Sequence, residues 1–155
     1  MIILETQISV PNLSAKNVFD FMIDCTDERY QQWWPKTHLS FHTIKRQPNN
    51  IGSLVLFDEM VGKRRLRFQA VITKSLPEQE IIWQMKKLFL LPAWLSLKFQ
   101  NTEDGVQITH CLSAGLSGFG KVLDPIIRVY LSKKFEKELA THANMEFNKL
   151  SKLLK

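Results

Sequence analysis

Three titratable residues recur at every fourth position near the C-terminus of the sequence: Glu138, His142 and Glu146. If this segment is helical, residues four apart lie on one face, so the three side chains would stack in a line. Imidazole and carboxylate groups in such a line can ligate a metal ion or act as a general acid and base. However, an i, i+4 pair supplies only two ligands, and no HExxH or second ligand motif accompanies it. We therefore expect solvated ion pairs, one of them with Lys134, and neither a bound metal nor a cofactor.

His110 is the second residue that could do chemistry. It stands between Ile108 and Leu112 in a segment where apolar and polar residues alternate, so it shares the apolar face of a strand. A histidine there is either a core residue with satisfied hydrogen bonds or a polar group that orients the carbonyl or hydroxyl of a ligand. We predict that it points into a cavity and anchors a ligand.

Large aromatic residues occupy many of the other inward positions. Core packing explains most of them, but tryptophan is hard to bury completely and its N–H needs a partner, so four Trp residues also suit the wall of a partly hydrated pocket. We predict a cavity of at least about 300 Å³. Its predicted lining is Phe68, Trp83, Phe99, His110, Leu131 and Phe135.

An apolar turn runs from Leu88 to Trp94, directly after Lys86 and Lys87. We interpret it as a mobile lip over the cavity mouth, with Leu88, Phe89 and Trp94 as the gate. A second interpretation is contact with a membrane surface, because basic residues meet anionic headgroups and Trp prefers the interface.

Length and composition indicate one ordinary globular domain over residues 1–155, with 45% apolar and 23% charged residues. The longest apolar stretch is far shorter than the roughly 20 residues of a membrane span. The N-terminus has no signal-like pattern, so we expect a cytoplasmic protein. No GxSxG, P-loop or GxGxxG is present, which gives no support to hydrolysis by a nucleophile elbow or to nucleotide binding.

The net charge of +6 is concentrated in one segment, since seven Lys or Arg and three Glu lie between Pro125 and Lys155. This pattern is typical of a solvated helix face, and we expect no nucleic-acid partner. Cys25 and Cys111 are far apart and outside any CxxC or Cys/His cluster, so both are predicted to be free thiols.

The elements that would position these residues can be read from periodicity. A strand over Ile2–Val10 precedes two short helices, at Ser14–Asp24 and Thr26–Trp33. Six strands follow, and their close spacing requires antiparallel pairing. They are predicted at His38–Arg46, Ser53–Met60, Lys63–Leu76, Glu80–Lys86, Leu95–Thr102 and Val106–Ala114. Asp124-Pro125 then begins a helix that is predicted to run without a break to Lys155.

This order of elements resembles the helix-grip fold of the START-like (SRPBCC) superfamily, and more locally its polyketide cyclase/dehydrase-like branch. Three passages carry the likeness. They are Ile8-Ser9-Val10-Pro11 with the helix from Ser14 to Phe19, the passage from Ala70 to Pro77 leading to Ile82-Trp83, and the helix entry from Gly118 to Ile127. The resemblance implies an α+β fold in which a curved antiparallel sheet of about seven strands grips a long C-terminal helix.

The resemblance also implies an apolar cavity between sheet and helix that holds a lipid, sterol, quinone, polyketide or similar small hydrophobic molecule. Because the superfamily includes carriers and enzymes, three functions stay open. The first is ligand binding, and the second is a cyclase or dehydratase that uses His110 or the Glu138 and His142 line as acid–base groups. The third is an adaptor that contacts a membrane or a protein through the Leu88–Trp94 turn.

Overall fold

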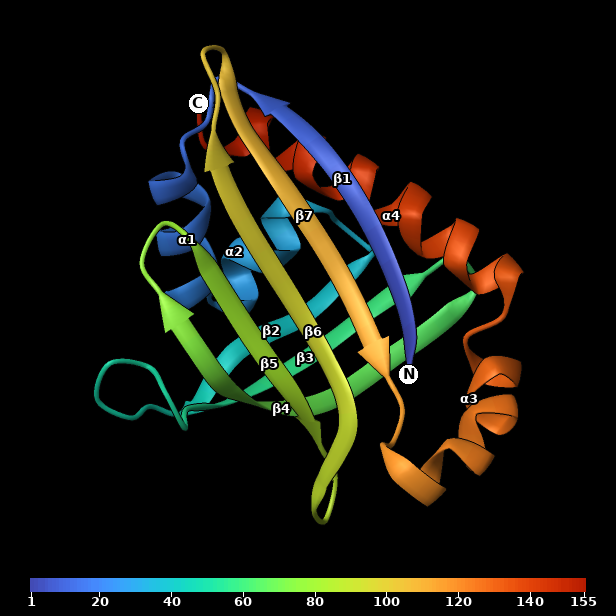
Figure 1. The fold of residues 1–155 in the computed structure, drawn as a ribbon. Helices are drawn as coiled ribbons and strands as arrows, with labels where there is room; N and C mark the ends of the chain where they lie inside the picture. The colour runs from blue at the N-terminus through green and yellow to red at the C-terminus, as the bar shows by residue number, and fades with distance from the viewer.

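The computed structural model describes all 155 residues as an α+β domain. Seven strands form one antiparallel sheet, and the helices lie mainly on its concave side (Figure 1). The elements in chain order are β1 (Ile2–Pro11), α1 (Ala15–Ile23), α2 (Asp27–Trp33), β2 (His38–Lys45), β3 (Leu54–Val61), β4 (Arg64–Leu76), β5 (Glu80–Lys86), β6 (Leu90–Asn101), β7 (Gly105–Ala114), the 3-10 helix η1 (Gly118–Leu123), α3 (Asp124–Tyr130) and α4 (Lys133–Leu153).

The strands follow one another as a meander, except that β1 pairs with β7, which gives the order β1-β7-β6-β5-β4-β3-β2. The sheet curves around α1, α2 and α4, and α4 crosses behind it close to β1 (Figure 1). The predicted fold class, with two short helices after the first strand and a long helix across the sheet, is confirmed. No helix combines the length and apolar character that crossing a bilayer requires.

The two short helices begin where the sequence predicts because their caps are local. The Ser14 hydroxyl accepts from the Asn17 backbone N–H while the Asn17 side chain accepts from the Ser14 N–H, which completes a capping box. The Thr26 side chain accepts from the backbone N–H of Arg29 in the same way. These caps place α1 and α2 under the concave face, where Phe21, Tyr30 and Trp33 are buried.

The C-terminal helix is not continuous, so the prediction of one unbroken helix from Asp124 to Lys155 is wrong. α3 ends at Tyr130, and α4 begins after Ser132, whose hydroxyl accepts from the Phe135 N–H. Ser132 has extended backbone angles and therefore serves as the N-cap of a new helix. The apolar residues of the two helices consequently do not share one core: Phe135 of α4 is buried, whereas Ile126 and Val129 of α3 are exposed.

β6 also differs from the prediction, because it begins at Leu90 rather than Leu95. The β5–β6 connection is thus a tight hairpin whose tip is Lys87, Leu88 and Phe89. Trp94 lies within the strand, opposite Gln84 on one side and Ser113 on the other. Cys25 and Cys111 are free thiols, as predicted.

Candidate functional site

Two histidines and two glutamates meet where the β2–β3 edge of the sheet faces α4. His38 begins β2, Glu59 lies in β3, and His142 and Glu146 are one turn apart on α4. One ligand atom from each of the four side chains lies within 4.8 Å of the others. His38, His142 and Glu146 are buried, and Glu59 is nearly so. We call these four residues the His–Glu cluster.

Strand register explains half of the His–Glu cluster. His38 and Glu59 are direct cross-strand partners, so their side chains stand next to each other on the concave face. The other half comes from helix geometry, because residues four apart on α4 face the same way. The sequence indicated the helix pair. The sequence also indicates the direction of Glu59. It is two residues from both Phe57 and Val61, so in a strand it lies on the same inward face as these two apolar residues.

The separations within the cluster are short. His38 Nε2 lies 3.2 Å from Glu146 Oε1 and 3.8 Å from Glu59 Oε2. His142 Nε2 lies 3.3 Å from Glu59 Oε2 and 3.9 Å from Glu146 Oε2. Each imidazole is therefore flanked by both carboxylates.

Helix α2 holds the cluster in place from one side. The Tyr30 hydroxyl donates to Glu59 Oε2 at 2.8 Å, and the Tyr30 carbonyl oxygen lies 3.1 Å from His38 Nδ1. Trp33 Nε1 donates to the backbone carbonyl of Glu146 at 2.6 Å, which ties α2 to α4. Buried polar groups that are bonded in this way fix the orientation of the side chains they touch.

Aromatic rings enclose the two imidazoles. The Tyr30 ring stacks on His38 with centroids 3.9 Å apart and planes within 7°. Trp34 stacks on His142 at 4.8 Å, and Trp33 meets the His38 ring edge-on. Such packing restricts both rings to one rotamer, because a turned ring would collide with its neighbour.

Glu59 and His142 are the charged pair of the cluster. Burial by itself raises the pKa of Glu59, but the hydrogen bond and charge of His142, the charge of His38 and the Tyr30 hydroxyl together bring it below its ordinary value. Burial by itself lowers the pKa of His142, but the hydrogen bond to Glu59 and the charges of Glu146 and Glu59 raise it above its ordinary value. Both shifts favour the ionised forms.

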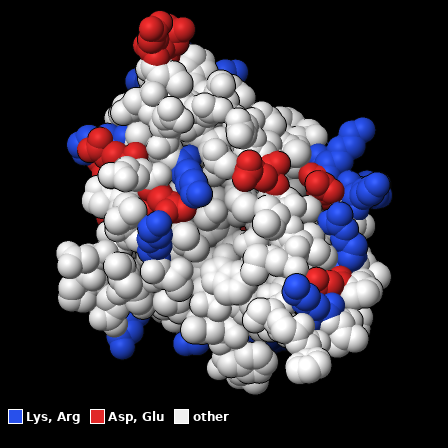
Figure 2. Space-filling view, in the orientation of Figure 1, with Lys and Arg blue, Asp and Glu red and all other residues white.

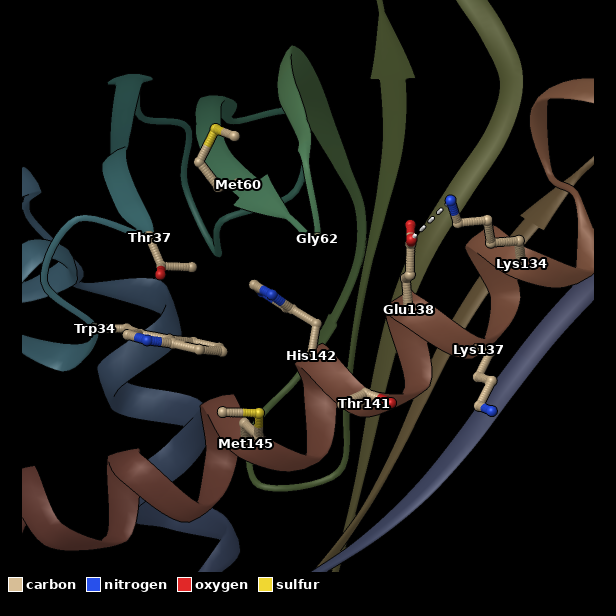
Figure 3. Close-up of a pocket in the computed structure, with 10 residues that line it drawn as sticks. All are labelled: Trp34, Thr37, Met60, Gly62, Lys134, Lys137, Glu138, Thr141, His142 and Met145. Atoms are coloured by element: carbon tan, nitrogen blue, oxygen red, sulfur yellow. Dashed lines mark ion pairs between the residues drawn. The ribbon is translucent and has the colours of Figure 1, made fainter.

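An open pocket of about 510 Å³ adjoins the cluster, between the β2–β3 edge and α4 (Figure 3). His142 projects from α4 into its inner wall beside Trp34, and Met60 and Met145 lie on either side (Figure 3). The rest of the lining is Thr37, Gly62, Lys134, Lys137, Glu138 and Thr141. His142 thus belongs both to the cluster and to the pocket wall.

A much smaller void lies on the inner side of the cluster. It has a volume of about 30 Å³, and its lining includes Glu59, Glu146, Tyr30 and His110. His110 is buried as expected for an inward strand position, and its Nδ1 has no hydrogen-bond partner. The void beside it has room for one or two water molecules, not for a drug-sized ligand.

The six residues expected to line one cavity are divided among different parts of the interior. Phe68, Trp83 and Phe99 pack in the main core, whereas Leu131 and Phe135 belong to a second cluster around Leu4 and Leu139. Of the six, His110 alone borders the inner void. In the main core, Phe57 of β3 stacks on Phe68 of β4 and meets Trp83 of β5 edge-on. These aromatic side chains fill the space in which a ligand was expected.

The expected gate residues lie at two places. Leu88 and Phe89 are exposed at the hairpin tip, and Trp94 is half-buried in β6. None of the three lines the pocket beside His142. Glu138, the first member of the helical line, is 3.9 Å from Lys134 and forms the expected ion pair (Figure 3). His142 and Glu146 are buried instead of solvated.

No protein-family model and no curated protein sequence matches the chain. Solved structures match it along nearly its whole length. A START superfamily protein from Mycobacterium smegmatis has a TM-score of 0.67 and 14% identity over 99% of both chains. Ara h 8.0201 has a TM-score of 0.65 and 10% identity over 99% of this chain and 97% of its own. Major latex-like protein 151 from Panax ginseng has a TM-score of 0.59 and 9% identity over 91% of this chain and 96% of its own. Since similarity at such low identity is similarity of architecture, the chain has the START-like helix-grip fold that its sequence predicted.

Proposed function

We propose that the chain binds a small, mainly apolar molecule in the open pocket between the β2–β3 edge and α4. The pocket volume of about 510 Å³ is within the range of small-molecule sites. Trp34, Met60 and Met145 supply apolar surface, and the imidazole of His142 supplies a polar group at the inner wall. Ligand-sized apolar space beside a buried polar anchor is the observation that carries the proposal.

The chemistry of the pocket narrows the ligand class. His142 can hydrogen-bond a carbonyl, hydroxyl or carboxylate oxygen, and Lys134 and Lys137 at the rim favour an acidic group. Lipids, quinones, sterol-like and polyketide-like molecules combine such an oxygen with an apolar body. The role proposed for His110 from the sequence, a polar ligand anchor, passes in this proposal to His142.

Intrinsic tryptophan fluorescence tests the proposal, because Trp34 lines the pocket. We expect saturable, one-to-one changes on titration with decanoic acid or with menadione. The Met145→Glu variant places a carboxylate among apolar groups and should weaken binding at least about tenfold, or about 1.4 kcal/mol. The control Asn144→Glu adds the same charge at an exposed position that does not line the pocket, and should bind as the parent does. Absence of saturable binding, or equal loss in both variants, would reject the site.

A second candidate is an acid–base enzyme of the cyclase or dehydratase type. The observation that favours it is a series of hydrogen-bonded titratable groups behind the pocket wall: the Tyr30 hydroxyl donates to Glu59, and Glu59 lies next to His142, which lines the pocket. Such a series can hold a proton on His142 and pass it to a substrate. Incubation with a linear β-keto thioester, followed by mass spectrometry, should then show loss of water or ring closure. His142→Gln should abolish that change, and Glu138→Gln should not.

A third candidate, contact with a membrane surface, rests on exposed apolar side chains at one end of the molecule. The β5–β6 hairpin tip and the η1–α3 segment both lie at the lower end in Figure 1, and that end carries few charged side chains in Figure 2. The exposed residues are Leu88, Phe89, Phe119, Val122, Ile126, Val129 and Tyr130. Lys86, Lys87, Lys121 and Arg128 adjoin them in the sequence, as suits an anionic lipid surface.

Co-sedimentation with vesicles tests the third candidate. The protein should pellet with vesicles of mixed phosphatidylcholine and phosphatidylglycerol and much less with phosphatidylcholine alone. The double variant Phe89→Ser and Phe119→Ser should stay in the supernatant. Ile51→Ser, at a comparably exposed residue between β2 and β3, is the control and should pellet as the parent does. Binding that ignores both lipid charge and the double substitution would exclude this surface.

A further inference from the structure

His38 has an unusual hydrogen-bonding state. Its side chain is only 1% exposed, and Nε2 has no hydrogen-bond partner. Nδ1 faces the Tyr30 carbonyl oxygen, which can only accept, so Nδ1 carries a hydrogen, and in the neutral form of the ring Nε2 presents a lone pair. That lone pair lies inside the His–Glu cluster, beside Glu146 and Glu59. Buried polar atoms without partners are rare in native proteins, which points to a missing partner at this place.

The spacing of the four donors suits a metal ion. A four-coordinate zinc ion with bonds of about 2.0–2.1 Å separates its ligand atoms by about 3.3–3.4 Å. The four nitrogen-to-oxygen separations in the cluster are 3.2, 3.3, 3.8 and 3.9 Å. Because all four donors lie within 4.8 Å of one another, closure around an ion requires side-chain movements of only about an ångström.

The charge of the cluster also suits a divalent cation. Two glutamates with two neutral imidazoles carry −2, which a divalent ion would cancel. Buried carboxylates are costly without full compensation. Without an ion, full compensation would place a positive charge on both imidazoles, whose ring centroids are only 6.1 Å apart, whereas one divalent ion compensates both carboxylates and leaves the imidazoles neutral. A donor set of two nitrogens and two oxygens is typical for zinc, iron and related ions, whereas magnesium and calcium prefer oxygen alone.

The surroundings of the cluster resemble the outer shell of a metal site. Ligating histidines usually donate their other ring N–H to a carbonyl or carboxylate, as His38 does to Tyr30. Ligating carboxylates are usually hydrogen-bonded as well, as Glu59 is by the Tyr30 hydroxyl. The inner void borders Glu59 and Glu146 and has room for a coordinated water.

We propose that His38, Glu59, His142 and Glu146 bind one divalent transition-metal ion, for which Zn²⁺ has the best-matched geometry. Local spacing does not predict this site, because the helix pair His142 and Glu146 supplies only two ligands and the other two come from strands about eighty to a hundred residues away. The ion lies at the inner wall of the open pocket and is bound whether or not the pocket holds an organic ligand. The proposal therefore does not depend on the proposed function.

Metal-depleted protein, prepared by dialysis against a chelator, provides the test. Titration with Zn²⁺ in competition with a chromophoric chelator should give one ion per chain. Co²⁺ should bind at the same place and give the strong visible absorption of a four-coordinate ion. Mg²⁺ at millimolar concentration should not compete. Bound Zn²⁺ should also raise the unfolding temperature, because the ion binds the folded chain.

Matched variants locate the ion. Glu146→Gln and His142→Ala should each weaken Zn²⁺ binding by more than about 100-fold. Tyr30→Phe removes only the hydroxyl that donates to Glu59 and should weaken binding by about 10- to 100-fold. Glu138→Gln is the control, since Glu138 is one turn from His142 on the same helix and outside the cluster. It should bind Zn²⁺ as the parent does. Circular dichroism of each metal-free variant identifies any that fails to fold, and Glu146→Gln changes the shape of the cluster least.

Two results would overturn the proposal. One is the absence of stoichiometric Zn²⁺ or Co²⁺ binding by folded, metal-depleted protein, which would leave the cluster as an ion-pair network. The other is stoichiometric binding that survives Glu146→Gln and His142→Ala together, which would place the ion elsewhere. Neither result affects decanoate or menadione binding in the pocket, so the two proposals fail separately.

Discussion

At the scale of single residues, the contacts that organise the site come from side chains whose roles a linear pattern does not display. His38 follows a turn that contains Pro35 and lies next to an irregularity in the β2–β3 pairing, so alternation does not predict its direction. Trp33 is buried, and its indole N–H donates to the backbone carbonyl of Glu146, a contact that no local pattern displays. The helix line of Glu138, His142 and Glu146 could be predicted because its spacing is local. Its partners could not, because strand register brings them together.

The first prediction concerns the hydrogen bond that the Trp33 indole N–H donates to the backbone carbonyl of Glu146. Replacing Trp33 by Phe keeps most of the packing and leaves the Glu146 carbonyl without its donor in a buried place. The free energy of unfolding should fall by about 1–3 kcal/mol in urea titrations. Trp34→Phe is the comparison, because the Trp34 ring stacks on His142 and its indole N–H makes no hydrogen bond to the protein. An equal loss in both variants would show that ring size, not the hydrogen bond, decides stability.

The second prediction concerns His110 and the pH dependence of the unfolding free energy. Burial lowers its pKa most, the charge of His142 adds to this, and Glu146 and Glu59 offset it in part, so the pKa lies below its ordinary value. A histidine of this kind favours folding in its neutral form. Its stabilising contribution is complete above the unfolded-state pKa of about 6.5 and is lost as the pH falls toward the folded-state pKa.

The measurement compares the parent with His110→Gln at pH 7 and pH 5, both with a chelator present. The groups around position 110 are common to both proteins, so their titration cancels in the difference. The parent should lose more unfolding free energy than His110→Gln over this range. A difference that is constant with pH would mean that His110 does not change its charge on unfolding.

At the scale of elements, the sequence predicted those whose signals are local. The helices that begin after Ser14 and Thr26 were predicted from their caps, and β1, β4, β5 and β7 from alternation. The predicted bounds of these elements lie close to the observed ones. The break between α3 and α4 was missed because Ser132 is a tolerated helix residue as well as a good cap. At about 100° per residue the apolar positions between Ile126 and Leu154 do not share one stripe, a drift that is also typical of a single helix rolling over a curved sheet. The structure instead divides the segment into two helices, and α3 leaves its apolar side exposed.

The Ser132 cap gives the prediction at this scale. Ser132→Ala removes the acceptor for the Phe135 N–H at the start of α4, which carries two members of the His–Glu cluster. The expected loss is about 1 kcal/mol of unfolding free energy by thermal or urea denaturation. Ser117→Ala is a matched control, because Ser117 precedes η1 and makes no side-chain cap bond. If both variants lose the same amount, the cap at α4 does not stabilise the fold.

At the scale of the whole molecule, the pairing of β1 with β7 places the first strand at one edge of the sheet, beside the last strand. Pro11 lies opposite Gly105 at the end of this pair, and a Cβ on Gly105 would come within 2.1 Å of the Val10 carbonyl oxygen. Only glycine fits this close approach of two backbones. In the sequence, Gly105 ends the run Glu103-Asp104-Gly105, which is typical of a turn. The need for glycine at this position follows only from the contact with β1 in the folded chain.

Gly105→Ala should therefore separate β1 from β7 at this end. We expect a loss on the order of 1–3 kcal/mol in unfolding free energy, with faster amide hydrogen exchange in β1 than in β4. Gly118→Asn is the control, because nothing lies within 4 Å of its Cβ position and asparagine tolerates its φ of 61°. Exchange that accelerates evenly over all strands would contradict a local effect on the pair.

The same pairing affects how the chain is made. β1 leaves the ribosome before the six other strands, but its only strand partner is β7, so Ile8 must wait for Ile108 about a hundred residues later. At about 5–20 residues per second this is roughly 5–20 s. During that time the apolar face of β1, with Leu4, Ile8 and Val10, has no sheet to cover it, and its backbone edge is open to other chains. We therefore expect a nascent-chain chaperone that binds short apolar segments to bind this strand. We also expect rapid overexpression to produce more of the protein in inclusion bodies than slow expression does.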